Sequence, residues 1–185
     1  MHKLEGEVQE WFNCSLSKSD VSIYRDRGFE SHPHRMIINK NLVLVSGAIV
    51  FKEGRGKRRW FIVKQTGDEE EKWEIPRVPV RKTESSSRAA IRVMGEKGGM
   101  DAKILEEAGR AGGSTTINGE TVPQRHLYYL MMQEAAGEVL GFEDYKWLVY
   151  AKAVRKLSSK RERLMIRQAR QELIKWLREQ KNKEQ

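Results

Sequence analysis

Cysteine is nearly absent from this sequence, since Cys14 is the only one among 185 residues. A lone cysteine excludes an internal disulfide framework and a zinc site built from cysteines. It fits a reducing, intracellular setting, so we expect a cytoplasmic protein. Residues 1–7 also lack the apolar core of a signal peptide. The longest mostly apolar run, residues 42–51, is too short to span a bilayer and predicts a buried strand, so no membrane partner is expected.

Charged residues are plentiful by contrast. They make up 33% of the chain, and the formal net charge is +9. Clustered lysine and arginine raise the local concentration of phosphate groups, so this excess favours a nucleotide or RNA as partner. A solvated basic surface that specifies no site is an equal alternative. The length fits one compact domain, which we place at residues 41–180, with an extension (1–40) packing on it and a charged tail (181–185).

Apolar periodicity and turn residues predict the order of strands and helices. Strands are expected at residues 42–51, 59–64, 73–76, 102–108 and 126–133. A helix is expected to begin near residues 83–85, where hydroxyl groups cap free backbone N–H groups, and to end at Gly98-Gly99. The pair Asn118-Gly119 predicts a two-residue hairpin turn.

The C-terminal part of the sequence predicts a helix with one apolar stripe. Ser159 and Glu162 have the spacing of a capping box at its start. The stripe that follows consists of Ile166, Ala169, Leu173, Trp176 and Leu177. We expect the stripe to dock on the domain; the alternative is that it binds a protein partner or a second copy of the chain in a homodimer.

Residues 73–100, here called the box segment, have a distinctive spacing. Glu84 is followed eight positions later by Arg92, and Glu96, Gly99 and Met100 continue the register. This pattern resembles G-x5-E-x7-R-E-U-x-E-E-x-G-U, with U aliphatic, the loop and helix of the Nudix (MutT-like) hydrolase superfamily. The resemblance covers about residues 42–180. It implies an α+β fold, the Nudix-type α/β/α sandwich with a central mixed β-sheet and a C-terminal helix.

Three departures separate the box segment from the family pattern. Val78 stands at the position of the first glycine, and Val93 and Lys97 stand at two glutamate positions. In the family these glutamates hold divalent ions, which bind the diphosphate and activate water. Because residues 92, 93, 96 and 97 are expected to share one helical face, that face keeps Glu96 as its one carboxylate. These residues argue against ordinary Nudix hydrolysis.

A metal site stays open as an alternative. It would hold Mg²⁺ or Mn²⁺ through Glu96, Glu84 and Glu138, and Glu96 and Arg92 would be the catalytic residues of an active enzyme. Further carboxylates after the late strand are more simply solvated loop charges; they are Glu134, Glu143 and Asp144. In such an enzyme, water would attack one phosphorus of a diphosphate, with Arg92 orienting the helix and loop.

Cations dominate the box segment. The candidate phosphate ligands among them are Arg77, Arg81, Lys82, Arg88 and Lys97. We expect Lys97 and its neighbours to supply part of the positive charge that Mg²⁺ normally brings. The leading interpretation is a module that binds a nucleoside diphosphate derivative or RNA with little or no hydrolysis. The alternatives are a divergent Mg²⁺- or Mn²⁺-dependent pyrophosphohydrolase and a purely structural partner protein. Trp60, Tyr128 and Tyr129 are candidates for base stacking, although many strand aromatics belong to a core.

Overall fold

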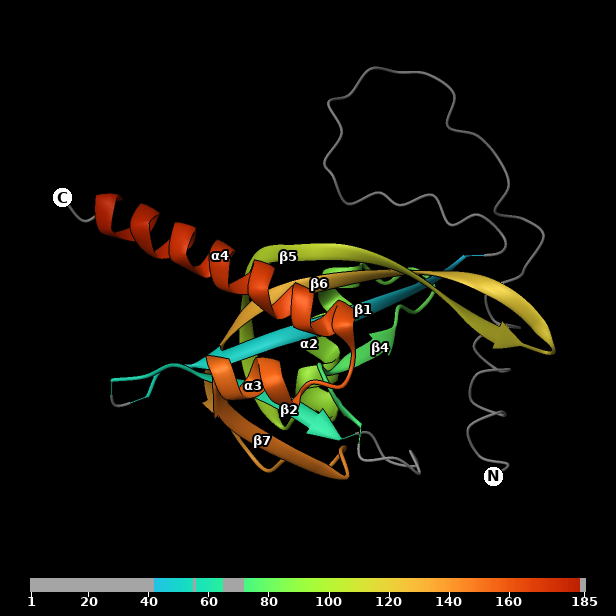
Figure 1. Ribbon diagram of the computed structural model, residues 1–185, viewed down its shortest axis with the longest axis horizontal. Coiled ribbons are helices and arrows are strands. Elements are labelled where there is room, and N and C mark those ends of the chain that lie inside the picture. Colours follow the sequence, from blue (N-terminus) through green and yellow to red (C-terminus); the bar gives the residue numbers. More distant parts are fainter. Residues whose placement is uncertain (1–41, 55, 65–71, 184–185) are drawn as a thin grey trace, which may run out of the picture.

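The computed structural model describes residues 42–54, 56–64 and 72–183, so the predicted extension 1–40 lies outside the described residues. Within these ranges the strands form one sheet with helices on both sides (Figure 1). The elements in chain order are β1 (Val43–Lys52), β2 (Arg59–Lys64), β3 (Trp73–Glu74), β4 (Arg77–Pro79), α2 (Ser86–Glu96), β5 (Met100–Ile117), β6 (Glu120–Ala136), β7 (Asp144–Val149), α3 (Tyr150–Lys156) and α4 (Lys160–Lys183).

The sheet is mixed, as predicted. Its central strands β1 and β6 run parallel, in a register that extends from Val43↔Gln124 to Phe51↔Met132. The other pairings are antiparallel, and the strand order is β3-β2-β1-β6-β5, with β4 beside β1 and β7 beside β2. Strand β1 is apolar on both faces, which is the composition expected of a strand that is covered on both sides.

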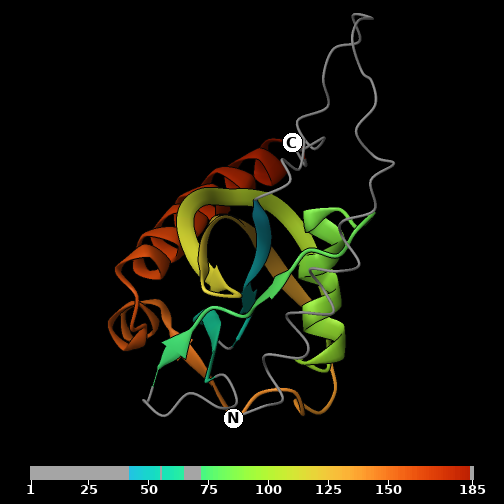
Figure 2. The same ribbon diagram turned by 90° about the vertical axis from the view of Figure 1, so that its right-hand side faces the viewer.

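Helices cover both faces of the sheet because β1 alternates between two cores. Ala48 and Val50 belong to the core under α2, while Ile49 and Phe51 belong to the core under α3 and α4. Figure 2 shows α2 on one side of the strands and α3 and α4 on the other. Each large apolar side chain that is fully buried in these cores stabilises the fold by roughly 1.5–3 kcal/mol. The predicted α/β/α sandwich is therefore confirmed.

The stripe of the C-terminal helix docks on the sheet. Ile166, Ala169 and Leu173 are at most 3% exposed in the second core. This confirms the docking interpretation. Helix α4 continues to Lys183, into the segment predicted as a charged tail. None of the helices in the described ranges combines the length and the apolar composition of a membrane-spanning segment.

Strands β5 and β6 form one long hairpin whose turn was predicted correctly. Asn118 and Gly119 have φ values of 51° and 83°, as a two-residue turn of the favoured mirror-image type requires. The strands are longer than predicted, because the polar, glycine-containing residues 109–117 show no apolar alternation and yet pair with β6. Three register shifts interrupt the pairing, and the hairpin curls strongly (Figure 2).

Candidate functional site

The box segment forms two short strands, a loop and helix α2; a strand was predicted at residues 73–76, and β4 beyond it was not predicted. Helix α2 begins after Ser85, whose hydroxyl accepts a hydrogen bond from the Arg88 N–H at 3.2 Å. Beyond its end, Gly99 adopts φ +56°, a left-handed conformation that glycine favours after helices. Both ends of the helix are thus set by residues that the sequence identifies locally.

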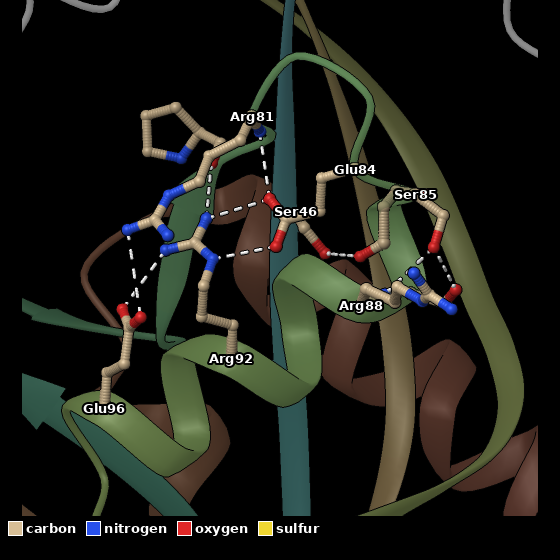
Figure 3. Close-up of polar contacts among 10 residues, drawn as sticks. Ser46, Arg81, Glu84, Ser85, Arg88, Arg92 and Glu96 are labelled. Atoms are coloured by element: carbon tan, nitrogen blue, oxygen red, sulfur yellow. Dashed lines mark hydrogen bonds and ion pairs between the residues drawn. The ribbon is translucent and has the colours of Figure 1, made fainter.

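A pair of side chains fastens the loop to α2. Glu84 accepts hydrogen bonds from Arg92 Nε at 2.8 Å, from Arg92 Nη2 at 3.0 Å and from the Arg81 N–H at 2.9 Å (Figure 3). Only 13% of the Glu84 side chain and 14% of the Arg92 side chain are exposed. Burial by itself raises the pKa of Glu84, but the hydrogen bonds from Arg92 and Arg81 outweigh it and hold that pKa below its usual value. Glu84 is therefore a carboxylate already engaged by arginine.

Replacing Arg92 with methionine is expected to lower the free energy of unfolding by about 2–3 kcal/mol, because the Glu84 carboxylate stays partly buried without its partner. Urea unfolding followed by circular dichroism measures the loss. The double variant Arg92→Met with Glu84→Gln should recover about half of it, as a double-mutant cycle would show. A loss below about 0.5 kcal/mol in the single variant would mean that the pair does not fasten the loop.

Glu96, the candidate metal ligand, also lies near arginines. Its Oε2 is 3.3 Å from Arg92 Nη1, and its Oε1 is 3.8 Å from Arg81 Nη2 (Figure 3). About half of the Glu96 side chain, 52%, is exposed. The arrangement therefore places one accessible carboxylate between two guanidinium groups.

Residues 92, 93, 96 and 97, which were predicted to share one helical face, differ in exposure. Val93 is 1% exposed and lies in the core, whereas Glu96 and Lys97 are exposed. The reason is that α2 packs on the sheet through Ala89, Ala90, Val93 and Met94.

The carboxylates around Glu96 do not fit a divalent ion. Glu84 and Glu96 each face arginine, and Glu143 forms an ion pair with Lys64. Glu138 is exposed, and its backbone carbonyl group, not its carboxylate, lies next to Gly99. Throughout the part of the chain that the structure describes, no group of three or more His, Cys, Asp or Glu side chains is placed to hold a metal. Mg²⁺ usually binds one or two carboxylates together with substrate phosphates, and here Glu84, Glu96 and Glu143 each already lie against a cation.

Four of the five predicted phosphate ligands are exposed on the loop and helix: Arg81, Lys82, Arg88 and Lys97. Lys82 and Arg88 lie toward the start of α2, while Lys97 lies at its end. The stem of Lys97 is packed against Gly141, whose N–H donates to the Lys97 carbonyl at 3.0 Å. The position of Lys97 next to Glu96 is thus fixed by the loop after β6.

Arg77 lies apart from these four, in a buried polar cluster on the opposite face of the sheet. Its guanidinium is 2.7 Å from Glu74 Oε2 and 3.6 Å from Oε1 of Glu162, a fully buried residue of α4. Successive strand residues point to opposite faces, and since Val78 packs in the core under α2, Arg77 faces α4. Its charge compensates buried carboxylates and does not contribute to the loop surface.

Glu162, a member of this cluster, was predicted to form a capping box with Ser159 at the start of α4. A capping box would direct its carboxylate to the start of its own helix, but Glu162 accepts a hydrogen bond from the Ile75 N–H at 3.2 Å. The capping-box prediction is therefore wrong. A signal was present, because Glu162 precedes Ile166 by one helical turn and shares the buried stripe with Ala169 and Leu173.

The predicted base-stacking role of the strand aromatics is also wrong. Trp60, Tyr128 and Tyr129 are at most 2% exposed. The ring of Tyr128 occupies the space that a side chain at Gly47 would need. The Tyr129 hydroxyl lies 2.5 Å from the Ser86 hydroxyl and so links β6 to α2. These rings build the two cores and are closed to a nucleobase.

Solved structures with the same arrangement include Nudix proteins. A binary complex of a C. elegans Ap4A hydrolase has a TM-score of 0.59 and 17% identity, covering 71% of this chain and 98% of that chain. The Nudix domain of Shewanella oneidensis NrtR, complexed with ADP ribose, has a TM-score of 0.59 and 18% identity, covering 71% and 88%. The E. coli dihydroneopterin triphosphate pyrophosphohydrolase has a TM-score of 0.55 and 14% identity, covering 68% and 92%. Neither a protein-family model nor a curated protein sequence matches the chain.

These similarities show that the chain has the Nudix fold. They extend over most of each neighbour, which fits a domain without large insertions. Identities of 14–18% establish the fold alone, so the chemistry has to be argued from the residues of this chain.

Proposed function

We propose that the chain is a binding module, which recognises a nucleoside diphosphate derivative or RNA through its box segment with little or no hydrolysis. The observation that carries the proposal is the environment of the two remaining box carboxylates. Glu84 and Glu96 both lie against arginine side chains. A carboxylate neutralised by a guanidinium attracts a divalent ion weakly, and without such an ion the usual Nudix nucleophile is not generated.

The exposed cations supply the attraction for phosphate. Arg81 reaches Glu96 over 3.8 Å in an ion pair whose side chains are both about half exposed. Such a pair stabilises the protein little, whereas a guanidinium bound to phosphate gains two parallel charge-assisted hydrogen bonds. An incoming phosphate would therefore draw Arg81 away from Glu96, with Lys97 beside it as a second cation. Cationic side chains of the protein thus bind the phosphate, which a metal ion does in a hydrolase.

The class of ligand follows from the same chemistry. The Nudix domain of NrtR, which has a similar fold, is complexed with ADP ribose, and this supports a nucleoside diphosphate derivative. The formal net charge of +9 supports RNA, whose repeated phosphates bind basic proteins by releasing counterions. Both ligands occur in the cytoplasm, where we place the protein.

A divergent Mg²⁺- or Mn²⁺-dependent pyrophosphohydrolase is the second candidate, because Glu96 remains 52% exposed. A diphosphate that arrives with its own metal ion would have to displace Arg81 and bring the ion to Glu96, with Glu138 as a further ligand. This candidate requires binding to depend on the metal and requires the diphosphate to be cleaved.

Thermal melts of the full chain separate the two candidates. The ligands are ADP ribose, ATP and a short uridine oligonucleotide, each with Mg²⁺ or with EDTA; a ligand that binds the folded state raises Tm. We expect the same rise in EDTA as in Mg²⁺ and, for ADP ribose and ATP, its loss in Lys97→Glu. The control Lys181→Glu makes the same charge change at an exposed position near the end of α4 and should keep the rise. A rise that needs Mg²⁺, with AMP released from ADP ribose, supports the hydrolase, and no rise with any ligand contradicts both.

A further inference from the structure

A second basic site lies on α3 and the edge strand β7. It is a hollow of about 360 Å³ lined by Lys146, Leu148, Lys152, Arg155 and Lys156, and we call it the α3–β7 pocket. Helix α3 packs on the face of the sheet opposite to α2, and Figure 2 shows the two helices on different sides of the strands. The pocket is therefore separate from the box segment, and its role does not depend on a ligand binding to that segment.

The charges of the α3–β7 pocket are all of one sign. Four of its five lining residues are cationic and exposed, and the fifth, Leu148, is apolar. Lys146 lies 3.8 Å from Asp144 in an exposed pair. Across the described ranges, no carboxylate forms an ion pair with Lys152, Arg155 or Lys156. Like charges gathered around a concave surface repel one another and attract an anion from solution.

Trp73 holds two of these cations in position. The ring is 1% exposed, and the ammonium groups of Lys146 and Lys156 lie 4.3 Å and 5.2 Å from its centroid. This packing accounts for the placement of two lysines, and it gives no reason for Lys152 and Arg155 to stand beside them. The cluster therefore contains more positive charge than the packing of Trp73 explains.

We propose that the α3–β7 pocket binds the sugar–phosphate backbone of single-stranded RNA. Lys152, Arg155 and Lys156 are spaced at i, i+3 and i+4, so they form a row on one face of α3 about one helical turn long. Lys146 lines the same hollow from β7, so a strand lying there meets cations from both elements. Leu148 and the lysine stems give the floor an apolar part that suits a ribose or a base.

The shape and charge of the pocket favour RNA over other anions. An acidic peptide would bring carboxylates, which match a planar guanidinium but leave the apolar floor without a partner. The hollow is shallow and open, so it suits a strand that passes over it more than a small ligand that needs an enclosed site.

Fluorescence anisotropy with a labelled uridine oligonucleotide tests the proposal on the full chain. In the double variant Lys152→Glu with Lys156→Glu, we expect Kd to rise at least about tenfold and the slope of log Kd against log salt to fall by about 1.4, the value for two lost phosphate contacts on a single strand. The matched control, Lys181→Glu with Lys183→Glu, makes the same change in net charge at exposed positions of α4 and should raise Kd much less.

A second double variant, in which both lysines are replaced by alanine (Lys152→Ala with Lys156→Ala), keeps the test valid if the charge reversal disturbs the fold. It should give a smaller rise in Kd in the same direction, while its melting curve matches that of the wild type. Equal Kd values for the pocket variants and the control would overturn the proposal. The proposal would also be overturned if poly-glutamate or UTP displaced the labelled RNA as effectively as unlabelled RNA does, when the competitors are compared at equal charge. Loss of RNA binding in Lys97→Glu alone would concern the box segment and would leave the pocket without a role, which also overturns it.

Discussion

Alanine at position 99 is expected to lower the free energy of unfolding by roughly 3 kcal/mol, because it combines backbone strain with a steric overlap. Gly99 has φ +56°, and a β-carbon there would stand 1.8 Å from the Glu138 carbonyl oxygen. The Gly137 N–H also donates to the Gly99 carbonyl at 2.6 Å, so neither segment moves freely. The overlap would push the loop after β6 away from the end of α2, next to Glu96 and Lys97. Chemical unfolding measures the effect.

Gly95 offers the matched control for this variant. It lies inside α2, is exposed, and a β-carbon there meets no atom within 4 Å. Gly95→Ala should therefore stabilise the protein by about 0.5–1 kcal/mol through helix propensity alone. If Gly99→Ala unfolds at the same denaturant concentration as the wild type, the close contact between the two segments does not exist in solution.

Glu162→Gln is expected to stabilise the protein at pH 8 by up to about 3 kcal/mol relative to the wild type, and to have no such effect below pH 4.5. Burial raises the pKa of Glu162 from 4.5 to about 7, although Arg77 opposes this. A carboxyl group with a raised pKa in the folded state contributes stability below its unfolded pKa and loses it as the pH rises through 7. Glutamine is neutral at every pH and keeps an acceptor for the Ile75 N–H.

His126 makes the free energy of unfolding rise with pH, which is opposite to the effect of Glu162. The contribution of Glu162 is therefore measured as the difference between the variant and the wild type at each pH. Burial, with Arg161 and Arg77 nearby, lowers the pKa of His126 to about 4, so its contribution is present above pH 6.5 and is lost as the pH falls through 4. Unfolding free energies of both proteins between pH 4.5 and 8 give the difference. Glu179→Gln, on the exposed side of α4, should show a flat difference. A flat difference for Glu162→Gln as well would mean that Glu162 is not buried as a neutral acid.

Features set by near neighbours in the chain could be predicted from the sequence. The start of α2 depends on the Ser85 hydroxyl, and its end depends on the left-handed Gly99. The hairpin turn depends on Asn118 and Gly119, which both adopt positive φ. The spacing from Glu84 to Arg92 was informative because the two residues make one contact across the loop. Each of these is a local requirement, so the residue types suffice to identify it.

Features set by packing between distant segments could not be predicted. Helical spacing alone does not say which side of α2 meets the sheet, and so Val93 was assigned to the same face as Glu96 although it is buried. The ion pair between Arg77 and Glu162 joins residues 85 positions apart, on a strand and a helix that meet only in the folded chain. For the same reason, the pairing of Glu96 with Arg81 appears only once the loop has been placed.

The placement of cations changes how the box segment is understood. The sequence suggested a single group of phosphate ligands, whereas the structure leaves Arg81 and Lys97 near Glu96 and puts Arg77 on the other face of the sheet. A separate basic cluster on α3 and β7 has no counterpart in the Nudix pattern. The described residues thus place two groups of cations on different faces of the sheet, and each group is testable alone.

Isothermal titration calorimetry with ADP ribose in EDTA is the most direct test of metal-free phosphate binding by the box segment. We predict binding in EDTA with a Kd that added Mg²⁺ leaves unchanged, no release of AMP, and loss of the heat signal in Lys97→Glu with its retention in Lys181→Glu. Binding that appears only after Mg²⁺ is added, accompanied by AMP, would contradict metal-free recognition.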